Sequence, residues 1–216
     1  TIHETGHEWF GNNITTKDIA DMWVHEGFTT YSEALFTEST QGKTAGEDYV
    51  IGQRRNIGNK TPMIGVYNMN TEGSSDMYNK GANLVHTIRQ LVDNDEKFRQ
   101  ILRGLSNTFY HSTTTSAAVE AFIAKQSGLK LNKVFDQYLR HAQIPTLAYK
   151  IENGTLHYKW ITDVTGFDMP VKVALTPSKF SWLTPTNNWQ SIKVEPTTNT
   201  LTVDRNFYIN LKKVTP

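Results

Sequence analysis

Residues 1–12 read TIHETGHEWFGN and place His3, Glu4 and His7 in the order His-Glu-x-x-His. On a helix, His3 and His7 lie one turn apart on the same face, close enough to bind one metal ion. Glu4 is next to the first histidine, where its carboxylate could take a proton from a metal-activated water without being a ligand itself. Because histidine and glutamate are ordinary helix-surface residues, the pattern alone is only moderately specific, and the third ligand decides its meaning.

The third ligand has to come from the sequence that follows. A metzincin would have Gly at position 10 and His at position 13, but this chain has Phe10 and Asn13, which excludes that class. Glu26 instead follows the second histidine after a spacer of eighteen residues. Two histidines and one glutamate leave a fourth tetrahedral position for water, as in catalytic zinc sites. Glu33 lies two turns further along the same predicted helix face, where it could hold a ligand imidazole by a hydrogen bond.

The composition is that of a folded chain without a dominant charge. Of the 216 residues, 38% are hydrophobic and 20% are charged, which is enough to bury a sizeable core. The formal net charge is +1 and like charges form no block, so nothing points to a nucleic-acid partner. No run approaches the length of a membrane span. Cysteine is absent, which excludes disulfides and thiolate sites; this fits an exported, periplasmic enzyme but leaves the compartment open.

The periodicity of the apolar residues is helical in the first two thirds of the chain. Residues 19–36 and 44–57 carry apolar side chains at three- and four-residue intervals, as amphipathic helices do. Residues 58–76 are rich in Gly, Asn, Ser and Pro, which predicts a long irregular loop of a kind that is usually functional or mobile. Four more helices are expected after this loop, the third of them ended by Gly128.

The last third of the chain alternates as β-strands do. Two alternating runs flank Asn153-Gly154, a dipeptide typical of two-residue hairpin turns, and several short runs follow. We therefore predict two parts, a helical lobe at residues 1–144 and a small β-sandwich-like module at residues 145–216. The expected fold class is mainly α with a C-terminal all-β module.

Three segments carry a family resemblance: the His-Glu-x-x-His stretch with its continuation HEWFGN, HEGFTTYSE (25–33) and MYNKGA (77–82). Together they resemble the aminopeptidase N family of gluzincin metallopeptidases, and the resemblance covers essentially the whole chain. It implies the helical end of a thermolysin-like catalytic domain, followed by the family's small β-sandwich. It also implies a peptide substrate and one Zn²⁺ per chain, held by His3, His7 and Glu26.

The resemblance also assigns roles around the metal. Glu4 would be the general base, and Tyr78 would hydrogen-bond the oxyanion of the tetrahedral intermediate, a task that suits a phenol donor. Lys80, in the same segment, either helps to order the tyrosine loop or is a solvated lysine. His25 lies about 100° around the helix from Glu26, so we do not expect it to be a ligand.

The family's Gly-x-Met-Glu-Asn exopeptidase motif and its N-terminal domains are absent from these 216 residues. We therefore expect the chain to be a C-terminal portion of a longer enzyme, with the missing domains of the same polypeptide as its partners. The leading interpretation is a zinc aminopeptidase. One alternative is a related hydrolase of the leukotriene hydrolase branch, which uses the same metal site for epoxide opening. Another is a truncated fragment with weak zinc binding and no activity of its own, because only Thr1 and Ile2 precede His3 and helix ends fray.

Overall fold

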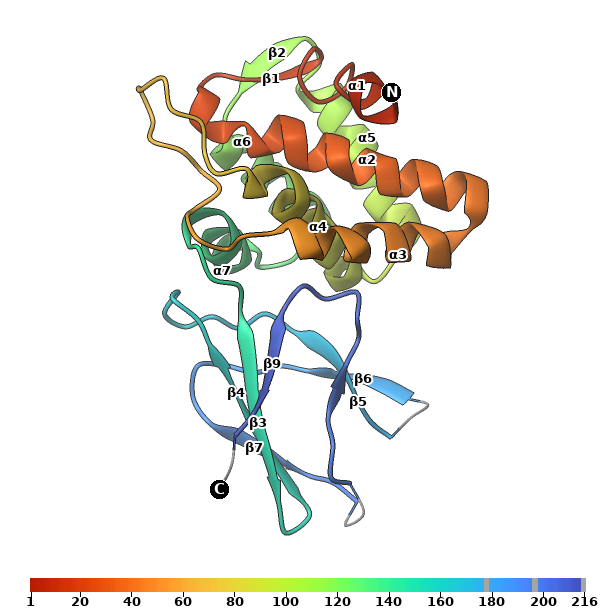
Figure 1. Cartoon of the computed structure of the whole chain (residues 1–216), viewed down its shortest axis with the longest axis vertical. Helices are drawn as coiled ribbons and strands as arrows, with labels where there is room; N and C mark the ends of the chain where they lie inside the picture. The colour runs from red at the N-terminus through yellow and green to blue at the C-terminus, as the bar shows by residue number, and fades with distance from the viewer. Residues whose placement is uncertain (177–178, 196–197, 215–216) are drawn as a thin grey trace.

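The computed structural model describes residues 1–176, 179–195 and 198–214. A helical part at the N-terminal end is followed by a strand-rich part that lies beneath it (Figure 1). The change from helices to strands falls between Arg140 and Thr146. The predicted fold class, mainly α with a C-terminal all-β module, is confirmed.

The helical part contains seven α-helices and three short turns among the described residues. They are α1 (Ile2–Gly6), η1 (Ile19–Asp21), α2 (Trp23–Gln41), α3 (Lys43–Gly52), η2 (Gln53–Asn56), α4 (Asp76–Val92), α5 (Asp95–Thr108), α6 (Ser116–Ser127), α7 (Asn132–Phe135) and the π-helical turn η3 (Asp136–Arg140). The helix expected at 19–36 begins instead with η1, because the Asp18 side chain accepts a hydrogen bond from Ala20 N and caps that turn. Gly128 ends α6 in the left-handed conformation, as predicted.

Helix α4 is the centre of the helical part. Most of its residues are buried, and it packs along α2 over several turns. The loop that precedes it, residues 57–75, contains no helix or strand, as the sequence predicts for 58–76. The loop is nevertheless pinned, since Met63 N and Ile64 N both donate to Leu139 O, and Tyr67 Oη donates to Asp21 Oδ1 at 2.7 Å. These hydrogen bonds fix the path of the loop that leads into α4.

A short parallel pair of strands, β1 (Ile14–Thr16) and β2 (Ser112–Thr114), was not expected from the sequence. Each has three residues, too few to show alternation. The pair joins the α1–α2 connection to the α5–α6 connection, at the top of the helical part (Figure 1).

The strand-rich part is built on the predicted hairpin of β3 (Thr146–Glu152) and β4 (Thr155–Ile161). Asn153 and Gly154 have φ values of 49° and 66°, so both central residues of the turn are left-handed and the hairpin prediction is confirmed. One sheet has the order β7-β4-β3-β9 and the other β6-β5-β8. The remaining strands are β5 (Val171–Thr176), β6 (Lys179–Leu183), β7 (Gln190–Lys193), β8 (Thr202–Val203) and β9 (Asn210–Lys213).

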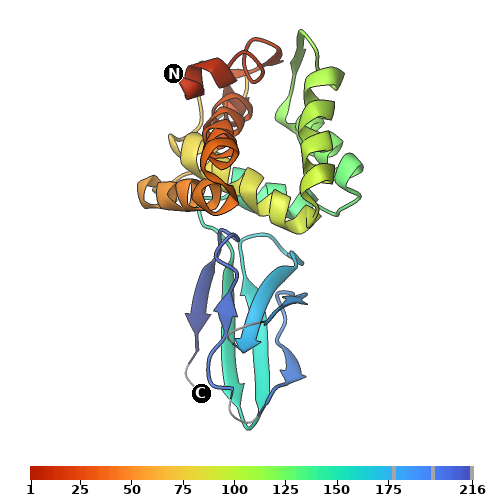
Figure 2. The same ribbon diagram turned by 90° about the vertical axis from the view of Figure 1, so that its right-hand side faces the viewer.

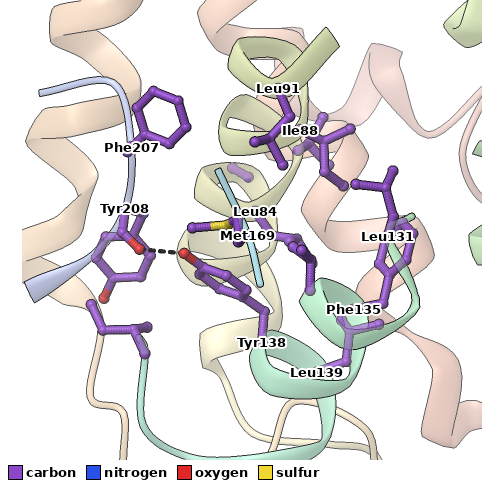
Figure 3. Packing of buried hydrophobic residues seen from close by; sticks show 14 of the residues in the cluster. Leu84, Ile88, Leu91, Leu131, Phe135, Tyr138, Leu139, Met169, Phe207 and Tyr208 are labelled. Atoms are coloured by element: carbon purple, nitrogen blue, oxygen red, sulfur yellow. Dashed lines mark hydrogen bonds between the residues drawn. The ribbon is translucent and has the colours of Figure 1, made fainter. Parts of the chain in front are cut away.

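The two parts share one continuous core. The turned view shows the helices above and the strands below (Figure 2). At their junction Tyr138 Oη donates to Tyr208 O at 2.6 Å, inside a cluster of apolar side chains from both parts (Figure 3). The labelled members are Leu84, Ile88, Leu91, Leu131, Phe135, Leu139, Met169 and Phe207. Within the described residues, no helix is long and apolar enough to cross a membrane.

Candidate active site

The side chains of the His-Glu-x-x-His stretch converge with Glu26. His3 lies in α1, whereas His7 is the C-cap of this helix, which ends one residue earlier. The two imidazole rings lie 4.8 Å apart between centroids, edge to face. His3 Nε2 is 3.2 Å from Glu26 Oε2, and His7 Nε2 is 3.6 Å from the same oxygen. Three potential ligand atoms thus face one another across a small space.

Hydrogen bonds on the far side of each ring orient both histidines. His3 Nδ1 is 2.8 Å from Glu33 Oε1, and His7 Nδ1 is 3.0 Å from Phe10 O. Because a carbonyl oxygen only accepts, the proton of neutral His7 lies on Nδ1, and the Nε2 lone pair points toward Glu26. The Glu33 carboxylate selects the same tautomer for His3. This arrangement of a carboxylate or carbonyl behind each imidazole is typical of metal-binding histidines.

Glu33 itself is held by a tyrosine that the sequence reasoning missed. Tyr49 of α3 donates its hydroxyl to Glu33 Oε2 at 2.5 Å, so both carboxylate oxygens are engaged. Burial raises the pKa of Tyr49, and the neighbouring Glu33 carboxylate raises it further, so the phenol stays a donor. No local pattern links these two residues, which lie on different helices.

The geometry fits a tetrahedral metal ion. Ligand bonds of about 2.0–2.1 Å at tetrahedral angles place neighbouring ligand atoms roughly 3.4 Å apart. The two distances from Glu26 Oε2, 3.2 Å to His3 Nε2 and 3.6 Å to His7 Nε2, bracket this value, and the potential ligand atoms of the three residues all lie within 4.8 Å of one another. Among the described residues, this is the one cluster with such a geometry. A set of two imidazoles and one carboxylate suits zinc and leaves a coordination position open.

Tyr78 is in the first turn of α4 and lies beside this cluster. Its ring is 6.0 Å from the His3 ring between centroids, with 29° between the planes. Burial is the main cause that raises the pKa of the phenol, and the negative charges of Glu26, then Glu72 and more weakly Glu4 raise it further. The hydroxyl is therefore a neutral donor at the edge of the site. Glu4 is exposed on α1.

A close helix crossing places Tyr78 next to Glu26. Gly27 follows the glutamate on α2, and Gly81 follows Tyr78 by less than a turn on α4. A Cβ added at Gly81 would lie 2.8 Å from Gly27 Cα, so only glycines allow the two backbones to touch here. Glu26 and Tyr78 thus come together because α2 and α4 approach closely at this point.

His25 does not belong to the group of His3, His7 and Glu26. Its Nε2 accepts a hydrogen bond from Thr16 N at 2.9 Å, which uses the lone pair that a metal would need. Burial lowers the pKa of this imidazole to about 4, and the nearby His7 contributes to the decrease. His25 therefore ties β1 to the start of α2, in agreement with the expectation that it is not a ligand.

Comparison with known proteins identifies the family. The model of the Peptidase family M1 domain matches residues 1–138. The chain belongs to peptidase family M1. The expected resemblance to the aminopeptidase N family is thereby confirmed, and an aminopeptidase N of Rattus norvegicus is 23% identical over 204 residues, which are 84% of this M1 chain and 20% of that protein.

Solved structures agree with the family. A crystal structure of Legionella pneumophila aminopeptidase A in complex with aspartic acid has the same fold over 99% of this M1 chain and 26% of its own, with a TM-score of 0.74 and 17% identity. An M1 zinc metallopeptidase mutant from Deinococcus radiodurans, bound to a Tyr-Ser-Ala substrate, is 25% identical with a TM-score of 0.57, over 66% of this chain and 33% of that one. The chain spans about a fifth of the length of the rat relative.

Proposed function

We propose that this M1 chain carries the catalytic centre of a zinc aminopeptidase, which removes N-terminal residues from peptides. One observation carries the proposal: His3, His7 and Glu26 direct three ligand atoms into one space, with the far nitrogen of each imidazole already hydrogen-bonded. Membership of a peptidase family supports it, as does the zinc metallopeptidase from Deinococcus radiodurans with a bound tripeptide substrate.

The residues around the three ligands suit peptide hydrolysis. Zinc in this position would supply Lewis acidity for the attacking water and the scissile carbonyl. A Glu4 carboxylate oxygen accepts the proton that the water loses on attack and passes it to the amine nitrogen as the C–N bond breaks. The Tyr78 hydroxyl donates a hydrogen bond to the carbonyl oxygen as it becomes negative. Glu33 keeps His3 in the tautomer that offers Nε2.

The test uses the complete reading frame that contains this chain. Zinc content is measured by mass spectrometry, and hydrolysis is followed on aminoacyl-anilides. We expect one zinc per chain, and a loss of at least about a hundredfold in kcat for Glu4→Gln, since a positioned general base contributes 10²–10⁴-fold. Glu8→Gln is the matched control, because Glu8 is also exposed and only one turn away. Equal activity of wild type and Glu4→Gln would exclude this mechanism.

The 216 residues on their own are a separate case. Helix α1 has five residues, and its N-cap Thr1 makes no side-chain hydrogen bond to it, so the turn that carries His3 is weakly held. We propose that the isolated 216-residue polypeptide binds zinc weakly and has little exopeptidase activity. Tight stoichiometric zinc and rapid turnover by this polypeptide would contradict the proposal, without affecting that for the complete protein.

A further inference from the structure

Lys80 is a buried cation that the proposed chemistry does not use. Its side chain is fully buried, which excludes the solvated lysine considered from the sequence. The ammonium donates to His141 O at 3.1 Å and to Ala142 O at 2.7 Å. Lys80 forms no ion pair with any carboxylate of the described residues, and Asp76 and Asp163 act on it only through space. Burying an ammonium with only carbonyl partners is costly because the charge loses its hydration. This desolvation lowers the pKa of Lys80 to about 8.

The two carbonyls belong to the segment that connects the helical part to the strands. Residues 141–143 follow η3 directly and lead into β3 at Thr146. A methionine at position 80 would fill a similar volume without a charge. What lysine adds is a pair of hydrogen bonds from α4 to this connecting segment.

A second route joins the same two places. Asp76, the first residue of α4, accepts from Gly58 N at 2.8 Å and from Asn59 N at 2.7 Å. Gln143 Nε2 donates to Asn59 O at 3.0 Å, and Asn59 Nδ2 donates to Tyr208 Oη, in the strand-rich part, at 2.8 Å. The first turn of α4 is thus tied to the connecting segment on both sides of Tyr78.

Tyr78 and Lys80 face opposite ways on α4. Residues two positions apart on an α-helix are separated by about 200° around its axis. Tyr78 therefore faces His3 while Lys80 faces the connecting segment. The contact of Gly81 with Gly27 sets the distance of α4 from α2. The two hydrogen bonds of Lys80 add a tie on the face of the first turn that lies opposite Tyr78.

We propose that Lys80 is a positioning residue, which holds the Tyr78 hydroxyl toward the metal cluster by anchoring the first turn of α4 to the carbonyls of residues 141 and 142. The strand-rich part then contributes to the active site through this anchor. The catalytic consequence rests on the proposed function, whereas the anchoring of α4 does not.

The test compares variants of the complete protein. Lys80→Met removes the hydrogen bonds at similar volume, and Tyr78→Phe is the reference for complete loss of the hydroxyl. Thr87→Val is the matched control, because Thr87 is equally buried on α4 and also contacts the strand-rich part, where Tyr208 N donates to its hydroxyl at 3.2 Å, but it lies more than two turns from Tyr78. The measurements are kcat, KM, zinc content, melting temperature and hydrogen exchange of a peptide covering residues 74–80.

For Lys80→Met we expect a fall in kcat of about tenfold or more toward the value of Tyr78→Phe, KM within about twofold, unchanged zinc content and faster exchange at residues 74–80. Thr87→Val should lower the melting temperature but keep kcat and the exchange of that peptide. Wild-type kcat and exchange in Lys80→Met would overturn the inference.

Two further outcomes are decisive in the same experiment. If Lys80→Met does not fold, Lys80→Gln replaces it, because glutamine is neutral and too short to reach both carbonyls, and the same expectations apply. If the wild-type protein has no peptidase activity, the proposed function fails, and the exchange of residues 74–80 alone decides whether Lys80 anchors α4.

Discussion

Gly27 of α2 and Gly81 of α4 are in direct backbone contact. A Cβ at Gly81 would lie 2.8 Å from Gly27 Cα, and a Cβ at Gly27 would lie 3.1 Å from Gly81 Cα. The contact lies one residue from Glu26 and three from Tyr78. Two side chains that are more than fifty positions apart in the sequence are adjacent because no side chain separates their helices.

Substitution of Gly81 by alanine should force α2 and α4 apart. Overpacking of this kind costs about 1–3 kcal/mol, and we expect a decrease of that size in the free energy of unfolding, measured by urea denaturation. Catalytic activity should fall with it, because Tyr78 moves relative to Glu26. Gly52→Ala is the control: Gly52 is helical, and a Cβ there would contact nothing within 4 Å. Gly52→Ala should increase the free energy of unfolding by about 0.5–1 kcal/mol. An equal effect of Gly52→Ala and Gly81→Ala would contradict the close contact between α2 and α4.

Loss of the carboxylate behind His3 should weaken zinc binding. Glu33→Gln removes the charge that accepts from His3 Nδ1, and such partners contribute about 10–100-fold in metal affinity. Competition with a chromogenic chelator measures the change. Tyr49→Phe, which removes only the hydrogen bond on the other oxygen of Glu33, should have a smaller effect in the same direction. An unchanged affinity in Glu33→Gln would show that His3 needs no such partner.

His86 should make the stability of the protein fall in acid. Its Nε2 is 2.9 Å from Asn206 Oδ1, and its Nδ1 is 3.1 Å from the Tyr31 hydroxyl. Asn206 Nδ2 donates to Asp204 Oδ1, which fixes the amide, so His86 Nε2 is the donor and Nδ1 accepts from the phenol. The buried imidazole is thus neutral, and burial lowers its pKa to about 4, with Arg89 among the smaller causes.

The sign of the effect follows from proton binding. Between pH about 6.5 and pH 4 the unfolded chain binds the proton and the folded chain does not, so the free energy of unfolding decreases as the pH falls through this window. The pKa difference corresponds to roughly 3 kcal/mol at most. The other charges that face His86 are Arg54, which opposes protonation, and Glu38, which favours it. Urea denaturation between pH 7 and pH 4 measures the slope, and a parallel slope in His86→Gln would assign the effect to other groups.

The sequence predicted the components of the site well where spacing carries the information. His3 and His7 are one turn apart, so any short helix brings them together, and the structure does so even though α1 ends at Gly6. The flanks of Glu26 and Tyr78 resemble a known family, and the family is confirmed. The hairpin at Asn153-Gly154 and the end of α6 were predictable because the backbone conformation there depends on one or two local residues.

Contacts between distant helices could not be predicted in the same way. Tyr49, which completes the support of His3, has no sequence signal, because its partner Glu33 lies on another helix and the pair meets only when α2 and α3 pack. From the sequence alone, Lys80 could equally have been a solvated lysine. The structure buries it, because burial depends on how the chain packs and not on the residue type. The strands β1 and β2 are too short to alternate and exist only because two connections meet.

The sequence by itself determined the candidate ligand types, their local spacing and the order of helices and strands, because these depend on residue chemistry and on periodicities of a few residues. Only the tertiary structure decided that Glu26 and Tyr78 share one site, which nitrogen of each histidine faces it, and that Lys80 is anchored behind it. The first depends on the close approach of α2 and α4, and the other two depend on hydrogen bonds that form only when the chain is packed.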